Sequence, residues 1–406
     1  MINLDKTYKV LRLDHFGRGI INIDGKTAFV ENAYIGDEVK VELVKEKKKY
    51  SIAKVKKYIK YSKSRKQSYC KYCNCCGGCD ILELLYEEQL RFKEEKVCNI
   101  INKYLKQKIK INNIIYGKEL NYRNKITLHV SNKKVGMYKK GSNDIVEISN
   151  CSLVNVKINE LIERLRRFIN NNPNNLKEIV IKTSYYNETM IVFIGEVSNE
   201  IVLNEFTDVE SLFINSICLK NKFIKDRIGE NDYFISKDSF FQVNSFNTIN
   251  LYNEILRLVK GKNINNVLDL YCGVGSIGIY VSKYVKNVVG VEVVDDAIEA
   301  AVENKKLNNI TNISLKCCKV EECVNEFSDI DLIIVDPPRS GLSKLVIDSI
   351  LKINPKYIIY VSCDIMTMMR DLNALTSIYT VGEFTPVDMF PNTFHVETVC
   401  LLCRKN

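Results

Sequence analysis

Residues 266–278 read NVLDLYCGVGSIG, and this stretch decides the fold of the C-terminal part of the chain. The apolar run Val267–Tyr271 predicts a buried parallel strand. Three glycines follow, Gly273, Gly275 and Gly278, and a helical pattern begins among them. A strand, a tight turn and a helix N-terminus in this order match the glycine fingerprint of nucleotide-binding α/β sheets.

Two carboxylates beside this turn indicate the ligand. Glu292 ends the next apolar run, Val288–Val291, and is placed to bind a ribose hydroxyl. Asp269, on the strand that leads into the turn, would repel a pyrophosphate at roughly 4–6 Å by about 1–4 kcal/mol. S-adenosylmethionine keeps the ribose, carries no phosphate and adds a sulfonium and an ammonium group. We therefore expect S-adenosylmethionine rather than a dinucleotide.

From Ser245 onward, helical patterns alternate with apolar strands, which is typical of a doubly wound α/β sheet. Ligands of such sheets collect at the carboxyl ends of the strands. Asp269, Glu292, Asp336 and Cys363 lie at these ends. The expected helices cover residues 246–260, 277–284, 295–307 and 342–353, and the expected strands cover residues 267–271, 288–291, 331–335 and 357–361.

Length and composition favour a protein of several domains. The chain has 406 residues, enough for two to four domains with apolar cores. No apolar run is long enough to span a membrane, and the first residues lack the apolar segment of a signal peptide. We expect a soluble, cytoplasmic protein without a membrane partner. Its 15 cysteines then indicate metal or thiol chemistry rather than a disulfide framework.

The positive charge is concentrated at the N-terminus. Residues 1–70 contain 17 Lys and Arg against 8 Asp and Glu, so they hold nine of the ten net positive charges. A basic first domain on a near-neutral body favours an anionic polymer as partner, most simply a nucleic acid. A solvated lysine-rich surface without a partner is the alternative.

Short apolar stretches in residues 1–60 predict a small β domain. Turns at Asp24–Gly25 and 35–37 separate these stretches. Five short strands in this length favour a closed barrel of the oligonucleotide-binding type. With its glycines around Gly17 and Gly19, the segment resembles the TRAM domain of RNA-modifying enzymes. The expected strands cover residues 8–13, 19–23, 27–30, 38–45 and 51–59.

A cysteine cluster follows in residues 70–79, which read CKYCNCCGGC. Five thiols within ten residues, with two glycines that let the backbone wrap, form a strong metal signal. The spacing permits a local set for zinc or an iron–sulfur cluster, and free buried thiols are the alternative. The local set consists of Cys70, Cys73, Cys76 and Cys79.

The region between the cysteines and the α/β sheet is predicted to be a packing helix, residues 80–104, and a mixed, sheet-rich domain. The polar cluster 122–125 fits an RNA contact or an exposed strand edge equally well. The isolated Cys151 also lies here. The expected domains are 1–62, an RNA-binding barrel, 63–240, the central domain, and 241–406, the cofactor-binding domain.

Two loops after predicted strands carry reactive side chains. Asp336-Pro-Pro-Arg339 is a rigid extended loop, because two prolines lack amide hydrogens, and it directs Asp336 toward the cleft. Cys363 leaves a strand, where a thiol with a lowered pKa attacks carbon, although most such cysteines are inert. Near the C-terminus, His395 and Glu397 are expected to share one face of a strand. Burial there raises the pKa of Glu397 toward that of a useful base.

Together these motifs resemble the S-adenosylmethionine-dependent RNA uracil-5-methyltransferase family over nearly the whole chain. The cysteine cluster and the TRAM-like segment resemble its 23S ribosomal RNA branch, since transfer RNA members generally lack both. The motifs occur in family order: Cys-x5-Cys-Gly-Gly-Cys, Phe240-Phe241-Gln242-Val243-Asn244, Asp269-Leu-Tyr271-Cys-Gly, Asp336-Pro-Pro-Arg339, Ser362-Cys363 and His395-Val-Glu397.

The resemblance implies a role for each matching residue. Cys363 is the nucleophile that adds to C6 of uracil, and Glu397 is the base that removes the C5 proton. Arg339 or His395 steadies charge on the ring carbonyl. The implied cofactor contacts are Gln242, Tyr271, Glu292 and Asp336, and the implied ligands of a [4Fe–4S] cluster are Cys70, Cys76, Cys79 and Cys151.

The expected substrate is a single-stranded or flipped uridine of ribosomal RNA, since a stacked base cannot reach such a pocket. The expected protein is a monomer. Three alternatives remain: a transfer RNA uracil-5-methyltransferase, an amine-directed or protein methyltransferase, and an RNA-binding protein with a structural metal and no catalysis. The chain departs from the family pattern at Ile365, where proline is usual and a softer loop is expected, and at Lys319, which receives no role.

Overall fold

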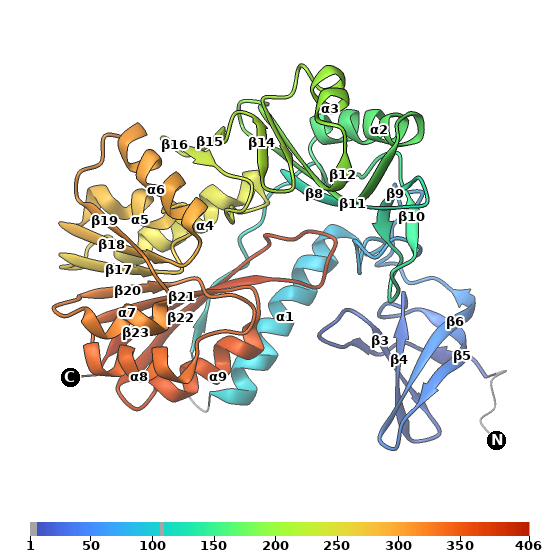
Figure 1. Ribbon diagram of the computed structural model, residues 1–406. Coiled ribbons are helices and arrows are strands. Elements are labelled where there is room, and N and C mark those ends of the chain that lie inside the picture. The colour runs from blue at the N-terminus through green and yellow to red at the C-terminus, as the bar shows by residue number, and fades with distance from the viewer. Residues whose placement is uncertain (1–5, 106–108, 406) are drawn as a thin grey trace.

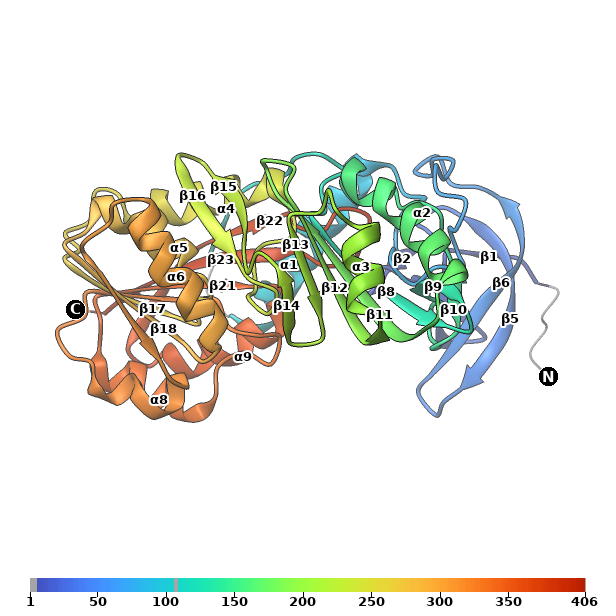
Figure 2. The same cartoon turned by 45° about the horizontal axis from the view of Figure 1, so that its top comes forward.

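The computed structural model describes residues 6–105 and 109–405. The described chain forms three large sheets. Figures 1 and 2 show an N-terminal sheet at one end, a C-terminal sheet at the other and a middle sheet between them. None of the described helices combines the length and the apolar character needed to cross a membrane.

The N-terminal sheet contains all the strands predicted for residues 1–60, but its pairing order is open, from β1 to β2. The predicted closed barrel is therefore not formed as a continuous ladder among the described strands. One bent segment approaches both edges, since the Val10 amide donates to Asp37 O and the Leu11 amide to Ile20 O. The strands are β1 (Tyr8–Lys9), β2 (Arg12–Leu13), β3 (Gly19–Ile23), β4 (Lys26–Glu31), β5 (Glu38–Glu46) and β6 (Tyr50–Lys60).

The middle sheet has seven strands in the order β10-β9-β8-β11-β12-β13-β14. The sequence did not predict the two helices of this domain, α2 and α3. Their apolar residues pack with the strands in one core. A hairpin, β15–β16, leads on to the C-terminal sheet. The elements are β8 (Lys125–Ser131), β9 (Lys134–Tyr138), β10 (Ile145–Glu147), α2 (Val156–Asn171), β11 (Asn174–Thr183), β12 (Thr189–Val197), α3 (Asn199–Glu205), β13 (Ser211–Ile214), β14 (Ile217–Lys220), β15 (Ile224–Ile228) and β16 (Asn231–Ile235).

The C-terminal sheet confirms the predicted α/β alternation. Its order is β19-β18-β17-β20-β21-β23-β22-β7, and β23 is antiparallel to both of its neighbours. Its strands are β7 (Lys110–Ile111), β17 (Asn266–Leu270), β18 (Asn287–Glu292), β19 (Ile313–Cys317), β20 (Leu332–Val335), β21 (Tyr357–Ser362), β22 (Tyr379–Val387) and β23 (Glu397–Arg404). Its helices are α4 (Ser245–Val259), α5 (Ser276–Val281), α6 (Asp295–Leu307), α7 (Val320–Cys323), α8 (Lys344–Ile353) and α9 (Ile365–Leu375), with short 3₁₀ turns at Ser282–Tyr284 and Val324–Glu326.

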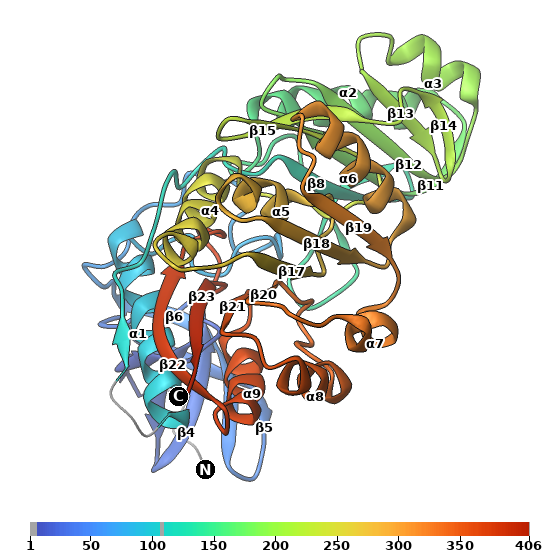
Figure 3. The ribbon, with the colours of Figure 1, turned by 90° about the vertical axis from the view of Figure 1, so that its left-hand side faces the viewer.

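Helices cover both faces of this sheet. Apolar residues of α4 and α5 pack in the core of one face, and those of α8 and α9 in the core of the other (Figure 3). Helix α1 (Tyr86–Tyr104) also belongs to the second core, through Val97 and Ile101. A helix that precedes the middle domain in sequence therefore packs against the C-terminal sheet.

Helix α1 begins later than predicted. Residues 80–85 make other contacts: the Asp80 and Ile81 amides donate to Asn392 O, and the Leu85 amide donates to Ser64 O. These amides are thus committed to distant segments before the first helical turn. The expectation of a softer loop at Ile365 is also wrong, because Ile365 is buried and begins α9, which Asp364 caps.

Candidate active site

The register of two adjacent strands brings the predicted nucleophile and base together. In the antiparallel pair β21–β23, Ser362 lies opposite Thr398. Cys363 follows Ser362, and Glu397 precedes Thr398, so the two reactive residues occupy facing positions at the same end of the sheet. Two residues 34 positions apart in sequence thereby become neighbours.

Asp336 joins them from the neighbouring strand on the other side. It follows Val335, which pairs with Tyr360 of β21. Gln242 reaches the same carboxylate, with its Nε2 3.4 Å from Asp336 Oδ2. Gln242 is buried, and its carbonyl accepts from Asn124 Nδ2 of the middle domain at 3.0 Å. Two of the predicted cofactor contacts are thus in direct contact with each other.

The thiol of Cys363 is half-buried and neutral at physiological pH. Burial, together with charge repulsion from Glu397 and Asp336 and partly offset by Arg339, raises the pKa of Cys363 to about 12. Nucleophilic attack by this thiol was expected to depend on a lowered pKa. In the protein alone the shift has the opposite sign, so forming the thiolate requires positive charge from a ligand.

Glu397 is the most deeply buried acid of this group. Burial, and then repulsion from Asp336, raise the pKa of Glu397 well above its usual value, and Arg339 offsets part of the shift. Its Oε1 has no hydrogen-bond partner in the part of the chain that the structure describes. The raised pKa that the sequence predicted for this carboxyl is confirmed in direction, and one oxygen is left to take a proton.

His395 is not a second cation of the site. Strand β23 begins at Glu397, so His395 lies in the preceding loop and the expected shared strand face is not formed. Burial and the nearby Arg339 lower the pKa of His395 to about 4. Its Nε2 lies 3.4 Å from Arg339 Nη2, where a neutral ring accepts a hydrogen bond. Of the two groups considered for charge stabilisation, Arg339 is the one that is charged.

The glycine turn has the expected strand–turn–helix geometry. Tyr271 has a φ of 64°, Gly273 a φ of 56° and Gly275 a φ of 75°, so three left-handed residues reverse the chain between β17 and α5. Asp269, the carboxylate expected to face the ligand, binds the following helix through Oδ2, and its Oδ1 has no partner among the described residues. It is buried and accepts from the Gly278 amide at 2.9 Å, and burial raises its pKa to about 7. The carboxylate thus anchors the start of α5.

Glu292 is held in place by backbone amides. Its Oε2 accepts from Gly273 at 3.1 Å, and its Oε1 accepts from Val293 at 2.7 Å and from Val294 at 2.9 Å. A carboxylate offers about four acceptor positions, so one is left for a ribose hydroxyl. The side chain is half-buried at the end of β18, next to the turn.

The cysteine cluster forms a separate feature. Among the residues that line a cavity of about 50 Å³ are Cys70, Cys73, Cys76, Cys79 and Cys151. Cys75 is exposed and does not line it. Thiolates are the ligands that iron and zinc prefer, so the donor set suits such a metal. Within the described residues, however, no three His, Cys, Asp or Glu side chains already stand in metal-binding geometry.

Sequence reasoning missed the residues that hold the site from outside. Lys93 of α1 forms a fully buried ion pair with Asp388. Lys93 and Asp388 are 295 residues apart. No local pattern signals such a pair, although a lysine on the apolar side of an amphipathic helix was a usable hint.

Comparison with known proteins agrees with this geometry. The tRNA (Uracil-5-)-methyltransferase family profile matches residues 213–405. An uncharacterized RNA methyltransferase of Staphylococcus epidermidis is 34% identical, over 98% of this chain and 97% of its own. One from Staphylococcus aureus is 32% identical, over 98% of each chain.

A solved structure aligns over the same length. The tRNA (uracil-54, C5)-methyltransferase of Pyrococcus abyssi, in complex with S-adenosyl-L-homocysteine, superposes with a TM-score of 0.80 at 29% identity, over 98% of this chain and 100% of that one. The chain belongs to the RNA uracil-5-methyltransferase family.

Proposed function

We propose that this protein transfers a methyl group from S-adenosylmethionine to C5 of a uridine in RNA, with Cys363 as nucleophile and Glu397 as base. The observation that carries the proposal is the β21–β23 register, which places the two side chains at facing positions. Both also lie close enough to Asp336 and Arg339 for these charges to shift their pKa values.

Each residue has a defined part in the reaction. The Cys363 thiol loses its proton to solvent, the thiolate sulfur bonds to C6 of uracil, and the ring electrons move onto the C4 carbonyl oxygen, where Arg339 balances the charge. S-adenosylmethionine, when bound, supplies an electrophilic methyl group to C5. Glu397 then takes the C5 proton, the electron pair re-forms the C5–C6 double bond and the C6–sulfur bond breaks.

The cofactor site is proposed from four residues around the glycine turn. Glu292 accepts the ribose hydroxyls, because one of its acceptor positions is left open and its direction is fixed by three amides. Asp336 and Gln242 present a carboxylate and an amide to the methionine portion, which carries a cationic sulfonium and a cationic ammonium group. Tyr271 forms one wall of the site, since its left-handed backbone turns it out of β17.

The RNA substrate is proposed to be 23S ribosomal RNA, bound in part by the basic TRAM-like N-terminal sheet. Transfer RNA is the second candidate. The Pyrococcus abyssi transfer RNA enzyme aligns over 98% of this chain, so the N-terminal region alone does not separate the two. Mapping 5-methyluridine in both RNAs from cells that lack the gene distinguishes them: loss from 23S RNA supports the first, and loss from transfer RNA alone contradicts it.

The cluster is proposed to be a [4Fe–4S] centre held by Cys70, Cys76, Cys79 and Cys151, which line one cavity. Anaerobically purified protein is then expected to be brown and to contain iron and sulfide in equal amounts. Cys151→Ser should lose both, whereas Cys75→Ser, which changes an exposed thiol outside the cavity, should keep them. A colourless protein with one zinc would contradict the proposal.

The reaction itself is tested with Cys363→Ala. This variant should bind S-adenosylmethionine as the natural protein does, because Cys363 is not among the proposed cofactor contacts. It should transfer no labelled methyl group to RNA and form no 5-methyluridine. Turnover at the natural rate would contradict the assigned nucleophile.

A further inference from the structure

The loop of residues 388–396, between β22 and β23, is buried to an unusual degree. Asp388 and Asn392 are both fully buried. The loop ends at Val396, directly before Glu397, so its position sets the position of the proposed base. Connecting loops usually lie on the surface, because their backbone polar groups need partners. The structure must therefore supply these partners from elsewhere.

Three side chains on one face of α1 supply them. Gln89, Lys93 and Lys96 stand at i, i+4 and i+7, which places them in one row along the helix. Gln89 binds Asn392 twice: its Oε1 accepts from the Asn392 amide at 2.8 Å, and its Nε2 donates to Asn392 Oδ1 at 3.1 Å. Lys96 donates to Phe394 O at 2.9 Å.

Lys93 makes the central contact. Its Nζ lies 2.5 Å from Asp388 Oδ1 and donates to Phe390 O at 2.9 Å, and both charged side chains are fully buried. Tyr86, one turn before Gln89, donates its hydroxyl to Asp388 Oδ2 at 2.9 Å. The first residues of the loop are thus tied to α1 through three hydrogen bonds to Asp388 and Phe390, its middle through Asn392 and its last part through Phe394.

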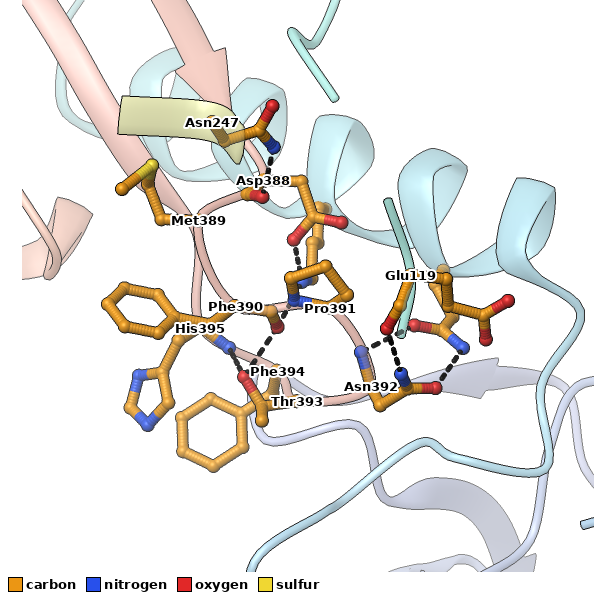
Figure 4. Close-up of polar contacts among 12 residues, drawn as sticks. Glu119, Asn247, Asp388, Met389, Phe390, Pro391, Asn392, Thr393, Phe394 and His395 are labelled. Carbon is orange, nitrogen blue, oxygen red and sulfur yellow. Dashed lines mark hydrogen bonds and ion pairs between the residues drawn. The ribbon is translucent and has the colours of Figure 1, made fainter. Parts of the chain in front are cut away.

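Residues outside α1 also form hydrogen bonds with the loop. Figure 4 shows Asn247 directed at Asp388 and Glu119 close to Asn392. Asn247 Nδ2 donates to Asp388 O at 2.7 Å, and Asn392 Nδ2 donates to Glu119 O at 3.1 Å. Thr393 Oγ1 accepts from the His395 amide at 3.3 Å. Hydrogen bonds thus fix the backbone of the loop as far as His395, two residues before Glu397.

The buried ion pair is better explained by position than by stability. Taking two charges out of water costs about as much as their attraction returns, so apolar residues of the same size are often equally stable. Removing one partner, in contrast, leaves an uncompensated buried charge and costs about 3–5 kcal/mol. The Lys93–Asp388 pair therefore fixes the position of loop 388–396 relative to α1.

We propose that Gln89, Lys93 and Lys96 are positioning residues of the methyl transfer: they hold loop 388–396 so that the Glu397 carboxyl is aligned with the C5 proton. This inference rests on the proposed function, because it takes Glu397 as the base. It assigns α1 a role in the proton-removal step and none in the attack by Cys363, whose loop α1 does not hold through these three side chains.

The test separates the two steps with two RNA substrates. On RNA with 5-fluorouridine at the target, attack and methyl transfer proceed but the fluorine cannot be removed, so the covalent adduct accumulates. On ordinary RNA the adduct disappears as fast as the base acts. Lys93→Met/Asp388→Asn removes both buried charges together. It should keep nearly the natural melting temperature and form the 5-fluorouridine adduct at the natural rate.

On ordinary RNA the same double variant should release product about 10- to 100-fold more slowly, with a persistent adduct, because small misplacements of a reacting group cost this much. Lys93→Met alone should show the slow release and also a lower melting temperature. Arg91→Met changes an exposed side chain of the same helix and is the matched control, with natural release and melting temperature expected.

Natural release by a stable double variant would overturn the inference. So would an equal slowing of both RNA reactions, because that result assigns α1 to general folding rather than to the base. If the natural protein itself forms no adduct with 5-fluorouridine RNA, the proposed function fails instead, and the two failures are thereby distinguished.

Discussion

The two reacting residues stand side by side but are held in place by different means. Cys363 leaves β21 and enters α9 within two residues, and Asp364 caps that helix by accepting from the Met366 and Thr367 amides. Glu397 follows a nine-residue loop that α1 holds from nearly 300 positions away. The nucleophile thus stands beside a locally capped helix, whereas the base follows a loop held by hydrogen bonds from a helix distant in sequence. Substitutions far from the site should therefore slow proton removal by Glu397 more than they slow the attack by Cys363.

The largest expected effect comes from removing the locally held group. Cys363→Ala should lower methyl transfer by a factor on the order of 10⁴ or more, because no other side chain replaces a covalent nucleophile. The rate of labelled methyl transfer under saturating cofactor measures it. Cys400→Ala, which changes a buried thiol in the middle of β23, is the control and should transfer methyl groups at a near-natural rate.

Removing the base should give a smaller loss of a different kind. Glu397→Gln should slow turnover by about 10²- to 10⁴-fold, the usual contribution of a general base. Because attack and methyl transfer remain, the variant should accumulate a covalent protein–RNA complex that survives denaturing gel electrophoresis. A variant that turns over slowly without any adduct would place Glu397 before the methyl transfer and break the contrast between the two residues.

Protons should leave the site when the cationic cofactor binds. Burial raises the pKa of Asp336 far above its usual value, so part of these carboxyls carry a proton near neutral pH. A sulfonium nearby lowers that pKa, and the proton is released. Calorimetry of S-adenosylmethionine binding in buffers of different ionisation enthalpy should show proton release near pH 7 that falls as the pH rises above 8.

The neutral product provides the comparison for this prediction. S-adenosyl-L-homocysteine lacks the sulfonium charge and should release fewer protons at the same pH. In Asp336→Asn the difference between the two ligands should shrink. Equal release by both ligands in the natural protein would mean that the raised pKa values play no part in cofactor binding.

The smallest expected effect concerns the cap beside the nucleophile. Asp364→Ala removes both cap bonds to α9 and should lower the free energy of unfolding by about 1 kcal/mol. The melting temperature should fall by a few degrees while methyl transfer remains within a few-fold of natural. Asp364→Asn, which keeps the cap acceptor, should restore most of the stability. An equal loss in both variants would show that the cap is not the cause.

The sequence predicted the elements that depend on local patterns. Helix α6 and the strands β17, β18 and β20 lie within one residue of their expected limits, because apolar periodicity and glycine turns act over short distances. Cys363, Glu397 and the cofactor residues were assigned by family resemblance, and their roles remain proposals. The expectation of a closed barrel was wrong because edge pairing is a tertiary property.

The contacts of α1 show why the long-range contacts could not be predicted from the sequence. Lys93 looks like any lysine of an amphipathic helix until Asp388 is placed beside it. The beginning of α1 was misplaced for the same reason, since the Asp80 and Ile81 amides are taken by Asn392 O. Asp269 was expected to face the ligand, but its buried bond to Gly278 follows from how closely α5 approaches β17.

The central claim is that one sulfur atom, Cys363 Sγ, bonds to the pyrimidine while the methyl group is transferred. Mass spectrometry of the adduct with 5-fluorouridine RNA tests it most directly. The account predicts a peptide that contains Cys363 linked to a nucleotide carrying one added methyl group and its fluorine. A nucleotide linked to any other residue, or a methylated RNA product with no covalent link at all, would contradict it.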